Sequence, residues 1–514
     1  MSNTKVDKSF CIFDYMVLIL IFFGFFIFSS KNSFYGLLFN ASKSEVYGIM
    51  LPIALLYLLL VVFLFYILNK LCNKSDVKHI CLYIFFTAFI LRLIVCSLNF
   101  YVPTNDFKNY YNLGVNAFYK NYQDVSSIVS VYHIPSFGGL AILNGIIMKV
   151  FSTSVYGMQL SNCVINSISC IFIFIIFKNK NLKIGAMAAL LYAIYPANIF
   201  STAVTINTHG SVLFNLIAIF FAVCSYKNIE NKKCYLYAVL SMLMFVISSF
   251  FHAASYYTFV LTLLFLSIFI QLKSFIKERK LIKNIWICLL IIILGSNILI
   301  NAGIGAMYSK GIINSTKGQP MSITFLVGLN IQDAGTLGEH ASADVNTARQ
   351  LEGKEQSEFI MSKIKENTSD IPAVINLFMN KEDRVWFTND SIFYWSTAGK
   401  LDAIAEDEII TDEEQEVSDW LHNMASLAGK IDLIFIHIIY LLSAIGILFR
   451  KRENLEDVIN IAVIATLGWI AVFMFTEVQS RYRCHAMPMF MVLASLGLYN
   501  ISIKAKLLIN KYIK

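Results

Sequence analysis

Long apolar runs, separated by short basic loops, constrain this chain more than any other feature of its sequence. Apolar residues make up 57% of the 514 residues, and charged residues make up only 14%. A soluble domain carries about 25% charged residues, and a run of about 20 apolar residues is long enough to cross a bilayer as a helix. The sequence therefore predicts an all-α polytopic membrane protein with about twelve transmembrane helices. The predicted spans include 155–177, 184–200 and 253–272, and the run 136–151 is apolar but short.

The placement of the charges predicts how the chain is oriented. The net charge of +8 could indicate a nucleic-acid partner, but the basic residues concentrate in short loops such as QLKSFIKERKLIK. Acidic residues instead outnumber basic ones in the segment 304–430. Because basic loops stay in the cytoplasm, this division explains the charge without nucleic acid. We expect a multi-pass plasma-membrane protein with a cytoplasmic amino terminus.

This topology divides the chain into three parts. Residues 1–303 form an N-terminal transmembrane region whose first outer loop is 101–135, and residues 431–514 form a C-terminal transmembrane region. The long segment 304–430 lies outside the cell and is expected to pack on the membrane helices as a lid. The ten cysteines show no CxxC pair, and the histidines show no HxH or HExxH pattern. We therefore expect no disulfide framework, structural metal or cofactor, while a divalent metal stays open.

The stretch Tyr101–Lys120 is the first place where the chain stops being apolar. Pro103 ends the preceding run, and Asp106 follows among residues that commonly begin helices. Aromatic and apolar residues then recur at helical spacing, which predicts a short amphipathic helix on the membrane surface. Asp106 would lie at its start, either as a helix cap or as a functional carboxylate.

Other candidate site residues are polar side chains expected near the outer surface. Arg481 and Arg483 flank Tyr482 on the last outer loop, where two guanidinium groups would suit a phosphate or a lipid headgroup. Arg92 lies inside a predicted span and must either reach the interface or line a polar cavity. The remaining candidates on the outer side are Tyr110, Asp124, His133 and Lys381.

The order of these residues resembles that in membrane glycosyltransferases of the GT-C fold. The closest resemblance is to the bacterial branch of glycosyltransferase family 39, which is related to protein O-mannosyltransferases and aminoarabinose transferases. It begins with Arg92, Pro103, Asp106, the Tyr110-Tyr111 pair and Ala117. Later motifs follow in the same order: His133-x-Pro135, Tyr195-Pro196, GLNIQDAGT, Lys381 with Trp386, and Glu477 with Arg481-Tyr482 and Pro488. The chain departs from the pattern at Thr208-His209, where relatives often carry an acidic residue, and at Phe251-His252, where Arg-Pro is common.

The resemblance implies a GT-C-type bundle that transfers a sugar from a polyprenyl-phosphate carrier to an acceptor on the outer face. The acceptor would be an envelope glycan, a lipid or a protein. Asp106 takes the position of the general base, and the substrate-binding candidates are Arg481, Arg483, Arg92, Asp124, His133, Lys381 and Tyr110. The alternatives are a glycan polymerase or ligase of another membrane fold, a transporter or flippase, and a non-catalytic membrane scaffold.

Overall fold

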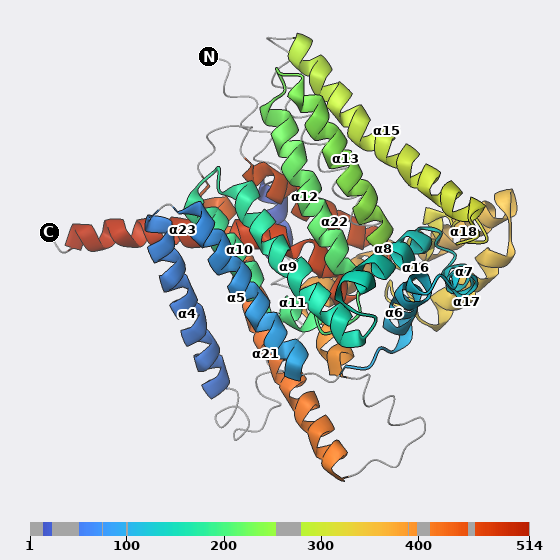
Figure 1. The fold of residues 1–514 in the computed structure, drawn as a ribbon, viewed down its shortest axis with the longest axis horizontal. Helices are drawn as coiled ribbons and strands as arrows, with labels where there is room; N and C mark the ends of the chain where they lie inside the picture. The colour runs from blue at the N-terminus through green and yellow to red at the C-terminus, as the bar shows by residue number, and fades with distance from the viewer. Residues whose placement is uncertain are drawn as a thin grey trace.

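The structure is a computed structural model that describes residues 14–22, 51–74, 76–98, 101–252, 279–388, 390–397, 412–450 and 458–512. Throughout these residues the regular secondary structure is helical (Figure 1). Eight of the described helices are long and apolar enough to cross a membrane. The prediction of an all-α polytopic membrane protein is therefore confirmed. The predicted span 253–272 lies outside the described residues.

The eight long helices have the following bounds. They are α4 (Leu51–Asn73), α5 (Val77–Leu98), α9 (Val155–Phe177), α12 (Thr208–Lys227), α13 (Lys233–Phe251), α15 (Arg279–Ser309), α21 (Asp412–Leu448) and α23 (Met487–Tyr512). Helices α15 and α21 extend beyond their apolar segments, so the predicted boundaries at 303/304 and 430/431 fall inside continuous helices. A hydrophobic run marks the part of a helix in lipid, but the helix itself continues into polar sequence.

Three shorter apolar helices also belong to the described part of the bundle: α8 (Ser136–Phe151), α10 (Leu182–Ala193) and α22 (Ile459–Phe475). The run predicted as one span over 184–200 is divided in two. Helix α10 ends before Pro196, and Pro196 begins the separate short helix α11 (Pro196–Ser201). Proline lacks the N–H that a helix interior needs but is accepted in the first turn, which explains the division.

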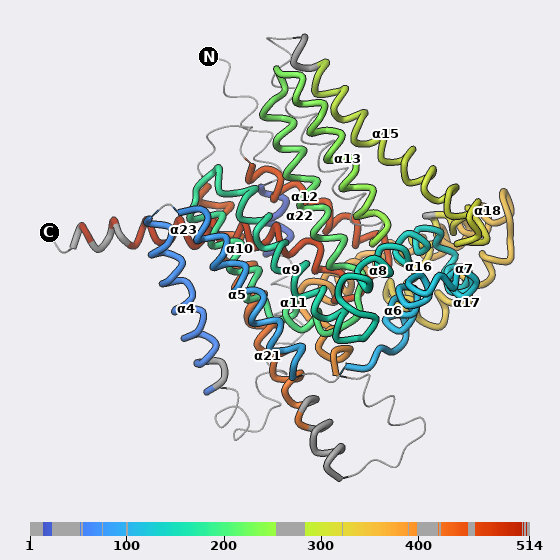
Figure 2. Tube along the Cα trace, in the orientation of Figure 1, coloured from blue at the N-terminus to red at the C-terminus, as the bar shows by residue number. Residues whose placement is uncertain are grey.

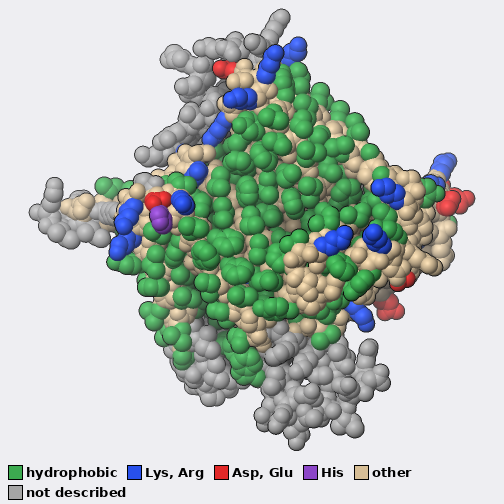
Figure 3. Space-filling view, in the orientation of Figure 1, with side chains coloured by type: hydrophobic (Ala, Val, Ile, Leu, Met, Phe, Trp, Pro, Cys, Tyr) green, Lys and Arg blue, Asp and Glu red, His purple; other side chains and the backbone are tan. Residues whose placement is uncertain are grey.

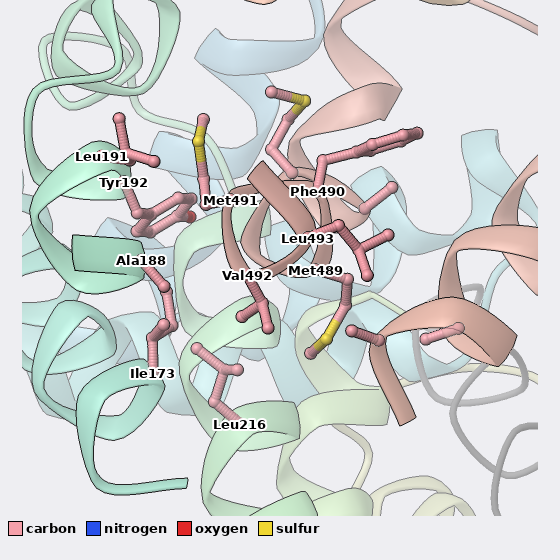
Figure 4. Packing of buried hydrophobic residues seen from close by; sticks show 14 of the residues in the cluster. Ile173, Ala188, Leu191, Tyr192, Leu216, Met489, Phe490, Met491, Val492 and Leu493 are labelled. Carbon is pink, nitrogen blue, oxygen red and sulfur yellow. The ribbon is translucent and has the colours of Figure 1, made fainter. Parts of the chain in front are cut away.

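The first half of α23 lies at the centre of the described bundle, while its carboxyl-terminal end projects from it (Figure 1). Its residues 489–493 are almost completely buried and pack against α9, α10 and α12, as Figure 4 shows. Lipid is as apolar as a leucine side chain, so inside a bilayer this burial stabilises α23 through close packing and not through removal from water. The helix is thus held firmly, and the segment that precedes it starts from a fixed position.

Several further helices gather at one end of the bundle, which we call the lid side (Figure 2): α6 (Asn105–Phe118), α7 (Tyr122–Tyr132), α16 (Met321–Gly328), α17 (Glu339–Gln350) and α18 (Gly353–Asn367). Helix α19 (Ile371–Glu382) is bonded to α16 through Lys381, the π-helical turn η2 (Asp383–Phe387) follows it, and the 3₁₀ helix η3 (Ser480–His485) packs against η2. Helix α6 packs on α8, where a Cβ on Gly114 would come within 2.8 Å of Asn144. This close approach needs glycine and fixes the first loop against the bundle.

The surface agrees with a bilayer around the long helices. Figure 3 shows a broad band of hydrophobic side chains across the face of the bundle, with Lys and Arg at its margins. Helices α16 to α18 bury a small core of their own that includes Leu326, Val345 and Ile360. The described part of the lid segment is therefore folded helical structure that also contacts α22.

Candidate active site on the lid side

Asp106 lies in the first turn of α6, but its carboxylate does not cap that helix. The N-cap position belongs to Thr104, whose side chain makes no capping hydrogen bond. The Tyr132 hydroxyl donates a hydrogen bond of 2.8 Å to Asp106 Oδ1, and Arg481 Nη2 lies 3.6 Å from Asp106 Oδ2. The Asp106 side chain remains 44% exposed. The carboxylate thus faces side chains from two other elements and is open to a ligand.

Tyr132 reaches Asp106 because α7 folds back along α6. It is the last residue of α7, and its ring packs edge-on against Phe137 at 5.2 Å. Asn109 Nδ2 donates a hydrogen bond of 2.8 Å to the Tyr132 oxygen, which leaves the phenol proton for Asp106. Burial raises the pKa of Tyr132 to about 12, so the hydroxyl stays a donor at neutral pH. Sequence reasoning missed Tyr132, since only the folded-back loop brings it to Asp106.

Arg481 is the cation of this site. Its guanidinium lies over the Phe107 ring at 5.1 Å and over the Tyr482 ring at 5.7 Å, and its side chain is 11% exposed. Burial opposes the charge, but the surrounding groups, the Asp106 carboxylate among them, outweigh it and raise the pKa of Arg481. Burial also raises the pKa of Tyr110, which keeps that phenol neutral. Of the eight predicted site residues, the structure brings together Asp106, Tyr110 and Arg481.

Arg483 has a different environment from Arg481. It is completely buried, and Nη2 forms an ion pair of 2.9 Å with Asp432 while Nε lies 3.4 Å from Asp390. Nη1 donates to the carbonyl of Thr388 at 2.7 Å, and Nε donates to the Tyr195 hydroxyl at 3.2 Å. All three nitrogens are thus engaged by the protein. The prediction that Arg483 is a second direct phosphate ligand does not fit this geometry.

The ion pairs of Arg483 join three parts of the chain that the sequence separates widely. Asp390 follows the lid turn η2, and Asp432 lies in α21. Asp432 also accepts a hydrogen bond of 3.0 Å from the backbone N–H of Ala197 at the start of α11. Neither aspartate was singled out from the sequence, although Asp432 directly precedes an apolar run. A carboxylate directly before an apolar run was the one sequence signal that could have identified Asp432.

Arg92 and Lys381 are also bound by backbone carbonyls. Arg92 is fully buried in α5 and donates to the carbonyls of Ala193 at 2.9 Å and Ala88 at 3.0 Å. It therefore neutralises the carboxyl end of α10, where a cation is favourable. Lys381 Nζ lies within 2.8 Å of three carbonyl oxygens, those of Gly328, Met474 and Thr476. Lys381 thereby attaches α19 to α16 and α22. Arg92 and Lys381 therefore both have structural roles.

Asp124 and His133 lie at the two ends of α7, away from the carboxylate of Asp106. Asp124 is exposed and accepts a hydrogen bond of 2.6 Å from Asn121 Nδ2. His133 ends α7 with a φ of 53°, and its carbonyl accepts a hydrogen bond of 2.9 Å from the Gln319 amide. Its side chain is exposed. Asp124 thus bonds within its own loop, and His133 contacts the lid segment through its backbone carbonyl.

A narrow cleft adjoins Arg481. Its free volume of about 10 Å³ is that of a single water molecule. It is lined by side chains from α11, the Asp390 segment and η3, including Asn198, Asp390 and Cys484. Across the described ranges, no group of three or more His, Cys, Asp or Glu side chains is placed to hold a metal ion. The chemistry offered by the described side chains is that of a carboxylate beside a phenol and a guanidinium.

The fold and this site define an all-α polytopic membrane protein with a cluster of acidic, basic and phenolic side chains where its long helices meet the lid segment. Comparison with protein-family models and with curated proteins gives no match. Among solved structures, the chain is similar to the archaeal oligosaccharyltransferase AglB from Archaeoglobus fulgidus, in complex with an inhibitory peptide and a dolichol-phosphate. The identity is 13% and the TM-score is 0.44, and the match covers 84% of this chain and 52% of AglB. The chain thus matches about half of AglB's length.

Proposed function

We propose that the protein is a membrane glycosyltransferase that moves a sugar from a polyprenyl-phosphate carrier to a hydroxyl acceptor on the outer face of the plasma membrane. The observation that carries this proposal is the Asp106–Arg481 pair, a half-exposed carboxylate beside a guanidinium at 3.6 Å. The order of motifs that resembles GT-C glycosyltransferases supports it. In this proposal the lid side is the outer side, as the basic loops predict.

The carboxylate of Asp106 would act as the general base. A hydroxyl is a poor nucleophile until its proton is removed, and a positioned base contributes roughly 10²–10⁴-fold to such a step. Asp106 takes the proton as the acceptor oxygen attacks the anomeric carbon of the sugar. Tyr132 holds Asp106 by a hydrogen bond of 2.8 Å and so orients the carboxylate.

Arg481 would stabilise the leaving group. As the bond between the anomeric carbon and the phosphate oxygen breaks, negative charge grows on the polyprenyl phosphate. A cation fixed where charge develops lowers the barrier, more so in a site that excludes water. The aromatic rings of Phe107 and Tyr482 hold the guanidinium in place, but unlike an anion they do not neutralise its charge.

Purified protein in liposomes tests the proposal with synthetic polyprenyl-phosphate hexoses as donors. The expected result is release of polyprenyl phosphate together with sugar transfer when envelope glycans, lipids and proteins are supplied. Asp124→Asn is the matched control, because Asp124 is an exposed carboxylate on the neighbouring helix that does not contact Asp106. Movement of the intact lipid-linked sugar across the bilayer without cleavage would instead establish a flippase, and folded protein that does neither would refute the proposal.

A further inference from the structure

The segment 476–480 connects α22 to η3, and we call it the strap. It leads directly to Arg481, because η3 begins at Ser480. The backbone of the strap is extended at both ends, with a φ of −102° at Thr476 and of −142° at Gln479. Successive side chains of an extended segment point to opposite sides. The strap therefore has two sides with different surroundings.

One side of the strap is bound to the lid segment. The buried residue Val478 donates a backbone hydrogen bond of 3.0 Å to the carbonyl of Gly335. The buried hydroxyl of Ser480 accepts a hydrogen bond of 2.8 Å from the backbone N–H of Ser391. At the start of the strap, Lys381 Nζ donates to the carbonyl of residue 476 at 2.7 Å. Alternate residues of the strap thus each bind a different part of the lid segment.

The other side of the strap carries partly exposed polar side chains and ends at the candidate active site. Gln479 Nε2 donates a hydrogen bond of 2.8 Å to Glu477 Oε1, so these two side chains share one side. Arg481 follows and is turned away from the lid contacts, with Nη2 at 3.6 Å from Asp106. A shift of the strap by one residue would put a serine or a tyrosine in the place of this guanidinium. The lid contacts therefore fix which residue meets Asp106.

Lys381 makes the strongest of these contacts, since hydrogen bonds from a charged donor are roughly twice as strong as neutral ones. Its ammonium has three N–H donors, and the carbonyl oxygens of Gly328, Met474 and Thr476 all lie within 2.8 Å of Nζ. Gly328 ends α16, and Met474 lies in the last turn of α22. A cation is favourable at the carboxyl end of a helix. Lys381 thus fixes the point from which the strap starts.

The GLNIQDAGT motif packs closely on this lysine. Gly335 has a φ of 74°, and a Cβ at this position would come within 2.8 Å of Lys381 Cδ. Both features require glycine. The carbonyl of the same glycine accepts the hydrogen bond from Val478. The motif therefore connects the stem of Lys381 to the middle of the strap.

We propose that Lys381 is a positioning residue, which sets the place of Arg481 through the strap. This inference rests on the proposed function, in which Arg481 stabilises the leaving phosphate. Loss of the ammonium releases the end of α22 and the start of the strap from the lid, so the guanidinium should leave its place over the Phe107 ring. A displacement of about 1 Å in a catalytic group costs roughly 100-fold in rate. A lid residue that touches no substrate should thus control the reaction through Arg481.

A double-mutant cycle tests whether Lys381 acts through Arg481. Lys381→Met keeps most of the side chain but removes the ammonium, and it should lower sugar transfer at least about tenfold. In an Arg481→Ala background the same change should alter transfer by less than about twofold, because the group that Lys381 positions is already absent. Arg384→Met is the matched control and should transfer like the wild type, since Arg384 is an exposed cation on the neighbouring turn η2. An equal loss in both backgrounds would show that Lys381 supports only the fold and would overturn the inference.

The reactivity of Arg481 tests the geometry independently of activity. Phenylglyoxal modifies accessible guanidinium groups, and peptide mass spectrometry of the full-length protein measures the modification of each arginine. Arg481 should react several-fold faster in Lys381→Met than in the wild type, while the exposed Arg349 reacts equally in both. Ser480→Ala removes one uncharged lid contact, so it should give the same change if Lys381→Met does not fold.

The two measurements separate this inference from the function beneath it. Unchanged reactivity of Arg481 in a folded variant would overturn the positioning role, whatever the activity. If the reactivity rises but the wild-type protein transfers no sugar, the proposed glycosyltransferase function fails and the control of Arg481 by the lid remains.

Discussion

Arg481 and Arg483 are two residues apart on η3, yet they belong to two different regions of the molecule. Arg481 lies at the partly open site with Asp106 and rests on two aromatic rings. Arg483 is fully buried between Asp432 and Asp390, with its nitrogens engaged by protein oxygens. The difference shows that two arginines on one short loop can have different roles. One side chain anchors the loop, and its neighbour is thereby held where a ligand can reach it.

The anchor explains how a six-residue 3₁₀ helix keeps a defined position. Arg483 connects η3 to α21 and to the end of the lid turn, and α23 begins two residues after η3 within the buried core. Removing one partner of a buried ion pair leaves the other charge uncompensated. Replacing Arg483 should therefore lower mainly stability, whereas replacing Arg481 should lower mainly activity.

The largest expected effect is on folding, from Arg483→Ala. The change leaves Asp432 and Asp390 buried without their counter-ion and should lower the free energy of unfolding by about 3–5 kcal/mol. Thermal unfolding of the purified protein in detergent measures it. Adding Asp432→Asn should recover part of the loss by removing one uncompensated carboxylate. An unchanged unfolding midpoint in Arg483→Ala would show that the buried anchor is unnecessary.

The next effect is on transfer, from Arg481→Ala. Losing the cation that stabilises the leaving phosphate should cost roughly 2–4 kcal/mol in the transition state, a decrease of about 30- to 1000-fold in transfer. Stability should change by less than about 1 kcal/mol, because the ion pair with Asp106 is partly exposed and 3.6 Å long. Arg481→Lys should restore only part of the activity. Wild-type transfer by Arg481→Ala would remove this arginine from the site.

The smallest effect should come from Tyr132→Phe. It removes the hydrogen bond to Asp106 and keeps the ring packing on Phe137, so transfer should fall by only about 2- to 10-fold, or about 0.5–1.5 kcal/mol. Tyr122→Phe at the other end of α7 is the control and should match the wild type. A loss as large as that of Arg481→Ala would mean that Tyr132 itself takes part in the reaction.

Much of the fold could be predicted because a helix that crosses lipid needs a run of about 20 apolar residues. The predicted runs 155–177 and 136–151 coincide with α9 and α8, and the surface helix after Pro103 is α6. The division at Pro196 and the long extensions of α15 and α21 were not predicted, since hydropathy reports the lipid-facing part of a helix and not its full length.

The candidate site could be predicted only in part, for a physical reason. Asp106 and Arg481 stand out as charged residues beside apolar runs, but Tyr132 meets them only through the folding of α7 onto α6. The sequence also gives Arg92 and Arg483 the same character as Arg481. Burial and backbone carbonyl partners distinguish them, and both depend on tertiary packing.

The central claim is that Asp106 acts as a base and not as a helix cap. In the structure its carboxylate accepts from Tyr132 and faces Arg481, while Thr104 holds the cap position. The most direct test is therefore the rate of sugar transfer from a polyprenyl-phosphate hexose by purified Asp106→Asn, at matched unfolding midpoints. Asparagine can still accept the hydrogen bond from Tyr132 but cannot take a proton, so transfer should fall at least about a hundredfold while Asp124→Asn keeps wild-type transfer. Near-normal transfer by Asp106→Asn would contradict the account.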